Sequence, residues 1–329
     1  MRIGALAGKA LAPLLVALSL SLTFGIHVAR VAPLHKHSQA TFLALEDGFE
    51  HYREMPRPWR SRLFANALAS LCVSYDERSA ERVVDPQDFA RGVGIWAGAW
   101  FMATCLVYWL ALGERSLFFS LGTFAGVIYG SMPGIDARVY PWDLPALFGY
   151  ALFTMAVLRG RWAWLSWIPL AVGFKETALV YALAFLFWEG ASWKRRLGWF
   201  LGTCALSVGV KLGIDLFTRN PQYFFTMSSG QGTFLRDNLR HLVTLDAKHL
   251  LFVNAGLLAA FLLSPPRGRA VWTFRGIALA FLGGLLYWGN IAEVRIFYEL
   301  LPVSLAGLAG AFLPELVSTS CSGPAGRPT

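Results

Sequence analysis

Ionisable side chains are sparse in this chain, and they fall in a few short groups separated by long apolar stretches. The groups are Glu46, Asp47, Glu50 and His51, then Asp136, Arg138 and Asp143, then Lys175 and Glu176, then Lys211, Asp215 and Arg219, and last Glu293 and Arg295. A carboxylate can act as a general base, and lysine and arginine bind phosphate. Groups of both signs, if the fold gathers them on one rim, suit a site for an anionic, membrane-anchored substrate.

The composition excludes most soluble enzyme folds. Of the 329 residues, 56% are hydrophobic and only 15% are charged, whereas a soluble domain carries about a quarter charged residues. The mean hydropathy of +0.49 points the same way. The sequence therefore predicts an integral membrane protein.

Neither the net charge nor the cysteines predict a particular partner or site. The net charge of +9 is accounted for by basic residues at the cytoplasmic edges of membrane spans, so no nucleic-acid partner is predicted. The cysteines Cys72, Cys105, Cys204 and Cys321 are far apart in sequence, which indicates neither a disulfide framework nor a zinc site.

Membrane spans of about 20 apolar residues are expected at several places. The candidates are 10–31, 92–112, 116–131, 144–158, 197–217, 250–263, 270–288 and 296–313. The stretch 162–188 is also apolar, except for Lys175 and Glu176 at its centre. As one helix it would be about 40 Å long and would hold two charges at mid-bilayer, each at about 3 kcal/mol. The alternative is a hairpin of two short helices that meet at these charges.

The positions of the basic loops favour the hairpin. With the hairpin and a cytoplasmic amino terminus, every short basic loop lies on the cytoplasmic side, as the positive-inside rule requires. The expected fold is thus an all-α polytopic transmembrane bundle of about ten membrane segments, with one domain over 1–316 and a disordered cytoplasmic tail over 317–329. A cleaved signal peptide at the amino terminus is the alternative to a first span, and it leaves the orientation unchanged.

The first external loop, 32–91, is the only long one, and it is expected to contain interfacial helices. Phe42, Leu45, Phe49 and Tyr52 recur at helical spacing and predict one amphipathic helix. A second helix is predicted to carry Phe64, Leu68 and Leu71 on its apolar side.

Each charged group also has a purely structural interpretation. Lys211 and Asp215, one helical turn apart, are typical of an ion pair that neutralises itself. Lys175 and Glu176 can form a hydrated turn, and the first-loop carboxylates can be the solvated side of an amphipathic helix. Gly92, Gly94 and Gly98 lie in an apolar span, so they favour close helix packing over a nucleotide-binding loop.

The layout resembles the GT-C class of polytopic membrane glycosyltransferases and similar uncharacterised bacterial membrane proteins. The resembling features lie between residues 10 and 314. They are the large first external loop with Glu46-Asp47 and Tyr52, then Arg60 and Arg62, the run Tyr140-Pro141-Trp142-Asp143 before an apolar span, the Lys175-Glu176 turn, and Glu293-x-Arg295 ahead of Pro302. The chain lacks a D-x-D or E-x-D signature and the later soluble domain of many members of that class.

This resemblance implies an inverting transfer of a sugar from a polyprenyl-phosphate carrier at the external or periplasmic face of the cytoplasmic membrane, in cell-surface glycan assembly. The implied partners are a lipid-linked sugar donor, a glycan or lipid acceptor and membrane lipids. Asp47 is the expected base and Glu46 the substitute; Arg138, Lys175, Arg219 and Arg295 are expected to bind the phosphate, with His51, Asp143, Glu176 and Glu293 in support. No cofactor is expected, and dependence on a divalent metal is left open.

Two other classes of function compete with this one. A transporter or flippase for a lipid-linked or anionic substrate would place its charges at a midplane cavity between repeats, and no internal repeat is visible in the sequence. A non-catalytic membrane subunit is the remaining alternative.

Overall fold

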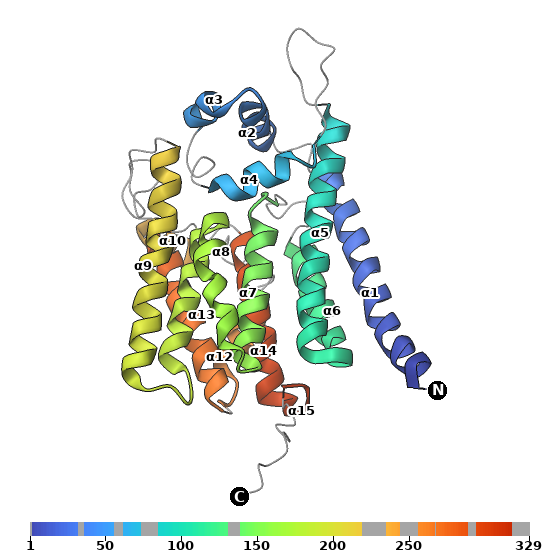
Figure 1. Cartoon of the computed structure of the whole chain (residues 1–329), viewed down its shortest axis with the longest axis vertical. Helices are drawn as coiled ribbons and strands as arrows, with labels where there is room; N and C mark the ends of the chain where they lie inside the picture. Colours follow the sequence, from blue (N-terminus) through green and yellow to red (C-terminus); the bar gives the residue numbers. More distant parts are fainter. Residues whose placement is uncertain are drawn as a thin grey trace, which may run out of the picture.

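The described part of the chain is built of helices. The computed structural model describes residues 2–31, 36–55, 62–73, 85–130, 139–218, 235–243, 256–266, 268–288 and 294–317, and these contain no β-strand. The predicted all-α fold class is therefore confirmed. Figure 1 shows long helices packed side by side, with three short helices across one end. We call these three the cap: α2 (Lys36–Glu46), α3 (Phe49–Glu54) and α4 (Leu63–Ser70).

Four helical stretches are long and apolar enough to cross a membrane, namely Leu11–Val31, Pro86–Tyr129, Trp193–Phe217 and Arg269–Tyr287. They belong to α1 (Arg2–Val31), to α5 (Pro86–Leu112) with η3 (Gly113–Arg115) and α6 (Ser116–Gly130), to α9 (Trp193–Phe217) and to α13 (Arg269–Trp288). The chain is therefore a membrane-associated protein. The total of about ten membrane segments stays a prediction.

The second of these stretches turns back on itself. Gly113 has a φ of 61°, a conformation that favours glycine, and it ends α5. Side chains on the two sides of this turn are in contact. The ring of Tyr108 lies 5.5 Å from that of Phe119, and the ring of Phe101 lies 5.9 Å from that of Phe124, measured between ring centroids. Because residues progressively further from Gly113 on the two sides are in contact, α5 and α6 run antiparallel.

The stretch 162–188 forms two arms that meet at Lys175. The 3-10 helix η4 (Trp162–Trp167) and α8 (Ile168–Phe174) make the first arm, and the 3-10 helix η5 (Glu176–Phe187) makes the second. Lys175 interrupts them with an extended backbone, at φ −155° and ψ 129°. At the other end Trp162 stacks on Trp188, with ring centroids 5.4 Å apart. The arms therefore lie side by side as a hairpin whose tip is Lys175-Glu176.

Close packing explains the glycines of α5, of which Gly94 and Gly98 face α1 and Gly92 faces the residues just after α4. A Cβ on Gly94 would lie 2.7 Å from the carbonyl oxygen of Gly25, and a Cβ on Gly98 would lie 3.0 Å from that of Ser21. A Cβ on Gly92 would overlap the backbone of Cys72. Small residues let two apolar helices approach in this way, so the predicted packing role of these glycines is confirmed.

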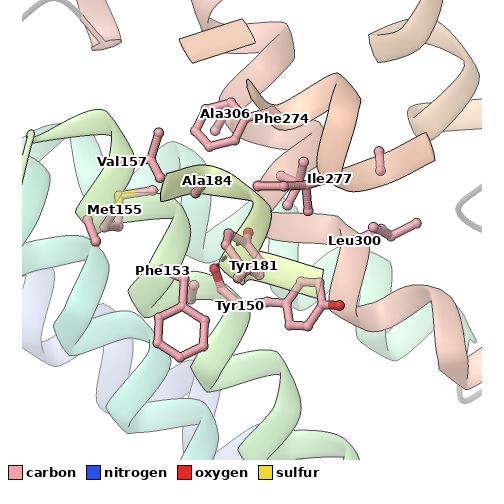
Figure 2. Packing of buried hydrophobic residues seen from close by; sticks show 14 of the residues in the cluster. Tyr150, Phe153, Met155, Val157, Tyr181, Ala184, Phe274, Ile277, Leu300 and Ala306 are labelled. Atoms are coloured by element: carbon pink, nitrogen blue, oxygen red, sulfur yellow. Dashed lines mark hydrogen bonds between the residues drawn. The ribbon is translucent and has the colours of Figure 1, made fainter. Parts of the chain in front are cut away.

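The largest buried cluster joins α7 (Asp143–Leu158), the hairpin and the carboxyl-terminal helices. The rings of Tyr150 and Tyr181 meet edge to face, with centroids 4.7 Å apart, at the centre of this packing (Figure 2). The other helices that contribute are α5, α6, α12 (Gly256–Leu263), α13, the 3-10 helix η7 (Val294–Leu300) and α14 (Leu301–Phe312). The short helices α10 (Leu235–Val243) and α15 (Pro314–Val317) complete the described elements. The tail predicted to be disordered over 317–329 begins one residue too early, because Val317 is the last residue of α15; the rest of it lies outside the described residues.

The cap differs from the prediction in two respects. The single amphipathic helix expected through Phe42 and Tyr52 is two helices, because Gly48 adopts a φ of 116° and separates α2 from α3. The predicted apolar residues Leu68, in α4, and Leu71, just after it, are exposed, and the buried side holds Leu63, Ala65, Asn66 and Ala69. The small side chains of Ala65 and Ala69 let α4 lie close to the elements beneath it.

Candidate functional site

The lysine at the hairpin tip lies between two carboxylates. The Nζ atom of Lys175 is 3.1 Å from Oδ1 of Asp143 and also forms an ion pair with Glu299. The three residues are almost completely buried, with exposed fractions of 3%, 1% and 0%. They come from the hairpin tip, the first turn of α7 and η7. We call them the Lys175 triad.

Further hydrogen bonds fix both carboxylates of the Lys175 triad. The backbone N–H of Tyr140 donates to Oδ2 of Asp143 over 2.9 Å, and the hydroxyl of Thr177 donates to Oε2 of Glu299. The hydroxyl of Tyr150 in turn donates to the carbonyl oxygen of Thr177 over 2.9 Å. Buried charges are tolerated when they are paired and hydrogen-bonded in this way.

Glu176, the second residue of the hairpin tip, joins the cap to the bundle. Arg62, which precedes α4, donates from Nη2 to Oε1 of Glu176 over 2.8 Å and from Nε to Oε2 over 3.4 Å. Its guanidinium carbon lies 4.4 Å from the ring centroid of Trp142, and that ring is stacked on Tyr140. The side chains of Arg62 and Glu176 are 12% and 33% exposed, so the pair lies at the edge of the buried region.

A third charged pair lies on the inward side of α9. Lys211 and Asp215 are both buried, and their charged atoms are 3.9 Å apart. The predicted ion pair between them is therefore confirmed. The charge of Lys211 also acts on Glu176, so this pair neighbours the hairpin tip. Thr203 and Ser207 continue the buried polar side of α9 away from the pair.

Together these contacts form one charged cluster at the end of the bundle that the cap covers. Its members are Arg62, Asp143, Lys175, Glu176, Lys211, Asp215 and Glu299. Among the described residues, four carboxyl groups face three cationic groups, and each of these cations already has a carboxylate beside it.

The cap is held on the bundle by further contacts near the cluster. Arg53 donates from Nε and Nη2 to the carbonyl oxygen of Phe217, over 3.2 and 3.0 Å, and thereby satisfies a carbonyl in the last turn of α9. Tyr52 packs against Ile214 in a small buried cluster. Gly173 leaves the space that Phe64 fills, because a Cβ there would overlap the phenyl ring.

The predicted carboxylates of the first loop are exposed at the end of α2. Glu46 is the last residue of α2, Asp47 follows it, and both are exposed. His51 is exposed on α3, with its ring Nδ1 3.4 Å from the carbonyl oxygen of Asp47. The ion-pair partners of Lys175 are Asp143 and Glu299, so the structure does not bring Asp47 onto Lys175.

The other predicted site residues divide into two groups. The structure brings Lys175 together with Asp143, and it pairs Glu176 with Arg62. Arg138, Arg219 and Glu293 lie outside the described residues, and of Arg295 the structure describes the place in η7 but not the side chain. In the part of the chain that is described, no group of three or more His, Cys, Asp or Glu residues is placed to hold a metal ion.

Glu299 is the member of the cluster that the sequence analysis did not single out. It is an acidic residue inside the apolar stretch that continues to Phe312. An ionisable residue in such a stretch is expensive unless it has a partner, and this signal could have identified it. Thr177 carried no comparable signal, because a hydroxyl is common in membrane helices.

Comparisons with protein-family models, with curated proteins and with solved structures find no match for this chain.

Proposed function

We propose that the chain is an inverting glycosyltransferase of the cytoplasmic membrane, which uses a polyprenyl-phosphate-linked sugar at the external face in cell-surface glycan assembly. The observation that carries the proposal is the charged cluster beneath the cap. Charged groups are costly inside a membrane bundle and tend to mark functional sites there. A lipid-linked donor would bring its phosphate and sugar to the end of the bundle, where the cap and the cluster meet.

The proposed reaction is a single displacement. The hydroxyl oxygen of the acceptor attacks the anomeric carbon of the sugar, the bond from that carbon to the phosphate oxygen breaks, and polyprenyl phosphate leaves. Asp47 accepts the hydroxyl proton as general base, with Glu46 as the substitute. A phosphate leaving group needs little protonation, but nearby cations must stabilise the charge that develops on it.

In this proposal the phosphate is bound mainly by Arg138, Arg219 and Arg295. Lys175 can reach a phosphate only by leaving Asp143 and Glu299, to which it is paired. We therefore give Lys175 a positioning role, in which it fixes the hairpin tip so that Glu176 meets Arg62. Asp143 and Glu176 support the same arrangement. Glu293 orients Arg295, and His51 lies beside the backbone of Asp47.

The first test separates binding from catalysis. Purified protein is titrated with polyprenyl phosphate and with polyprenol, and its thermal unfolding is followed. The proposal predicts that polyprenyl phosphate raises the midpoint of unfolding and that polyprenol has a much smaller effect, because tight binding to the folded state stabilises it by mass action. Equal effects of the two lipids would count against a phosphate-binding site.

The second test concerns the base. Asp47→Asn keeps the size of the side chain and removes its basicity, so we expect glycan assembly in cells to fall by about two to four orders of magnitude, while binding of polyprenyl phosphate is kept. The matched control is Glu54→Gln, on an exposed residue at the end of α3, which should leave assembly unchanged. Normal assembly with Asp47→Asn and also with Glu46→Gln/Asp47→Asn would refute the assigned role.

A second candidate function is transport of an anionic or lipid-linked substrate coupled to a proton. The observation that favours it is the Lys175 triad, in which two buried carboxyl groups share one ammonium group. Buried groups of this kind form proton relays in pumps and transporters. Reconstituted protein that moves labelled polyprenyl-phosphate sugar across a vesicle membrane in response to a proton gradient, without forming a glycosidic product, would favour this candidate over the first.

A further inference from the structure

Helix α10 carries an exposed apolar strip that no other element covers among the described residues. Leu235, Leu239 and Val243 follow one another at four-residue steps and are 37%, 50% and 88% exposed. Arg236, Asp237 and Arg240 are exposed on the same helix. A strip of this kind in a membrane protein is expected to be covered by another molecule, and the geometry of α10 indicates which one.

The level of α10 relative to the bundle is fixed by Asn238. This residue is fully buried, and its amide nitrogen donates to the carbonyl oxygens of Leu285 and Leu286 over 3.2 and 2.8 Å. Both carbonyls belong to the last turn of α13, where helical partners are missing. Asn238 therefore caps a helix that is long and apolar enough to cross a membrane.

The length of α13 places this cap at the membrane surface. Its 20 residues span about 30 Å, which matches the thickness of the hydrocarbon core. The last turn of α13 thus lies where the hydrocarbon gives way to headgroups. Because Asn238 is bonded to that turn, α10 lies at the same level.

The order of residues around α10 agrees with this level. With about 100° per residue, the helix presents in turn Asn238, then Leu235, Leu239 and Val243, then Arg236 and Arg240, and finally Asp237. A helix that lies along the surface of a bundle meets protein, hydrocarbon, headgroups and water in that same order. The arginines are then beside the headgroups, and the acidic residue faces water.

We propose that α10 is an interfacial helix that binds the surface of the lipid bilayer, with Arg236 and Arg240 holding anionic headgroups. The apolar strip enters the upper hydrocarbon region, as in other amphipathic helices of this type. Two positive charges beside the strip favour an anionic membrane surface over a neutral one. This inference is independent of the proposed transferase activity.

The experiment measures which medium surrounds α10 in the full-length protein. In a background without the native cysteines, a bimane fluorophore is attached at Leu239→Cys or at Asp237→Cys, and the protein is reconstituted into vesicles. The vesicles contain either phosphatidylcholine alone or an equal mixture with phosphatidylglycerol. Iodide quenches fluorophores in water, and brominated phosphatidylcholine quenches those in the hydrocarbon. Leu206→Cys on the exposed side of α9 is the reference for a position in lipid.

The label at position 239 should behave like the reference at 206, quenched by brominated lipid and protected from iodide, whereas the label at 237 should be quenched by iodide. In vesicles with phosphatidylglycerol, Arg236→Gln/Arg240→Gln should shift position 239 toward water. The ratio of bound to detached helix should fall about five-fold for each arginine, as expected for basic residues at an anionic surface.

Three outcomes would overturn the inference. Iodide quenching at 239 as strong as at 237 would show that the strip faces water. Protection of position 239 from both quenchers would show that protein covers the strip. If the ratio of bound to detached helix is the same with and without the two arginines, they do not hold anionic headgroups.

Discussion

Lys175 is the residue on which the charge balance of the bundle depends most. It is the one cationic group within ion-pair distance of both Asp143 and Glu299 among the described residues. Removing one partner of a buried ion pair is strongly destabilising, because the charge that remains is uncompensated. Each carboxyl group differs from Lys175 in this respect, since losing either one still leaves Lys175 with a partner.

This asymmetry gives a prediction at the residue scale. Lys175→Met should lower the free energy of unfolding by about 3–5 kcal/mol, because Asp143 and Glu299 both lose their ion pair with Lys175. Glu299→Gln should lower it by only about 1 kcal/mol, since the pair of Lys175 with Asp143 remains. Unfolding in mixed micelles of detergent and sodium dodecyl sulfate measures both values, with the exposed Glu114→Gln as control. If Glu299→Gln is as damaging as Lys175→Met, the shared-lysine arrangement is wrong.

Some residues of the charged cluster could be recognised from the sequence, and others could not. Lys175, Glu176 and Lys211 were recognisable because each interrupts an apolar stretch, and a membrane makes such interruptions costly. The partner of Lys211 was recognisable, because Asp215 lies one helical turn away, but the pairing of Lys175 was not, because Asp143 and Glu299 are 32 and 124 positions away from it. Which carboxylate meets which cation depends on the packing of several helices, and no local pattern records that.

At the scale of elements, the hairpin and the cap depend on a few backbone positions. The hairpin could be predicted because Lys175 and Glu176 divide a stretch that is too long for one span. The break at Gly48 was not predicted, since the spacing of Phe42 to Tyr52 is compatible with one continuous helix. The exposed side of α4 was also not predicted, because apolar residues in a membrane protein can face either lipid or protein.

The contact of Phe64 with Gly173 gives a prediction at the element scale. Gly173→Ala places a methyl group where the ring of Phe64 now lies, and overpacking of this kind costs about 1–3 kcal/mol. We expect the cap to detach more often, so that a cysteine at the buried position Ala69 reacts about ten times faster with a thiol reagent. The control is Gly202→Ala, where a Cβ meets open space and labelling should not change. Equal rates in the two variants would contradict the packing of α4 on α8.

At the scale of the whole molecule, the orientation in the membrane stays a prediction from the basic loops. A cysteine at Ser192, which lies beyond the hairpin and just before the basic start of α9, should be protected from an impermeant thiol reagent added outside intact cells. A cysteine at Leu71, which is 80% exposed after the last turn of α4, should be labelled under the same conditions. The native cysteines are replaced in both variants. Labelling at 192 and protection at 71 would reverse the topology.

The cap and the hairpin tip meet through charged groups at one end of the bundle. The most direct measurement is a double-mutant cycle of Arg62→Met and Glu176→Gln on the free energy of unfolding, because such a cycle isolates the interaction between the two side chains. The exposed pair Arg91 and Asp88, with charged atoms 3.4 Å apart, is the reference and should give less than about 1 kcal/mol. We expect a coupling of about 1–3 kcal/mol between Arg62 and Glu176, and a coupling no larger than that of the reference pair would show that this contact does not hold the cap on the hairpin tip.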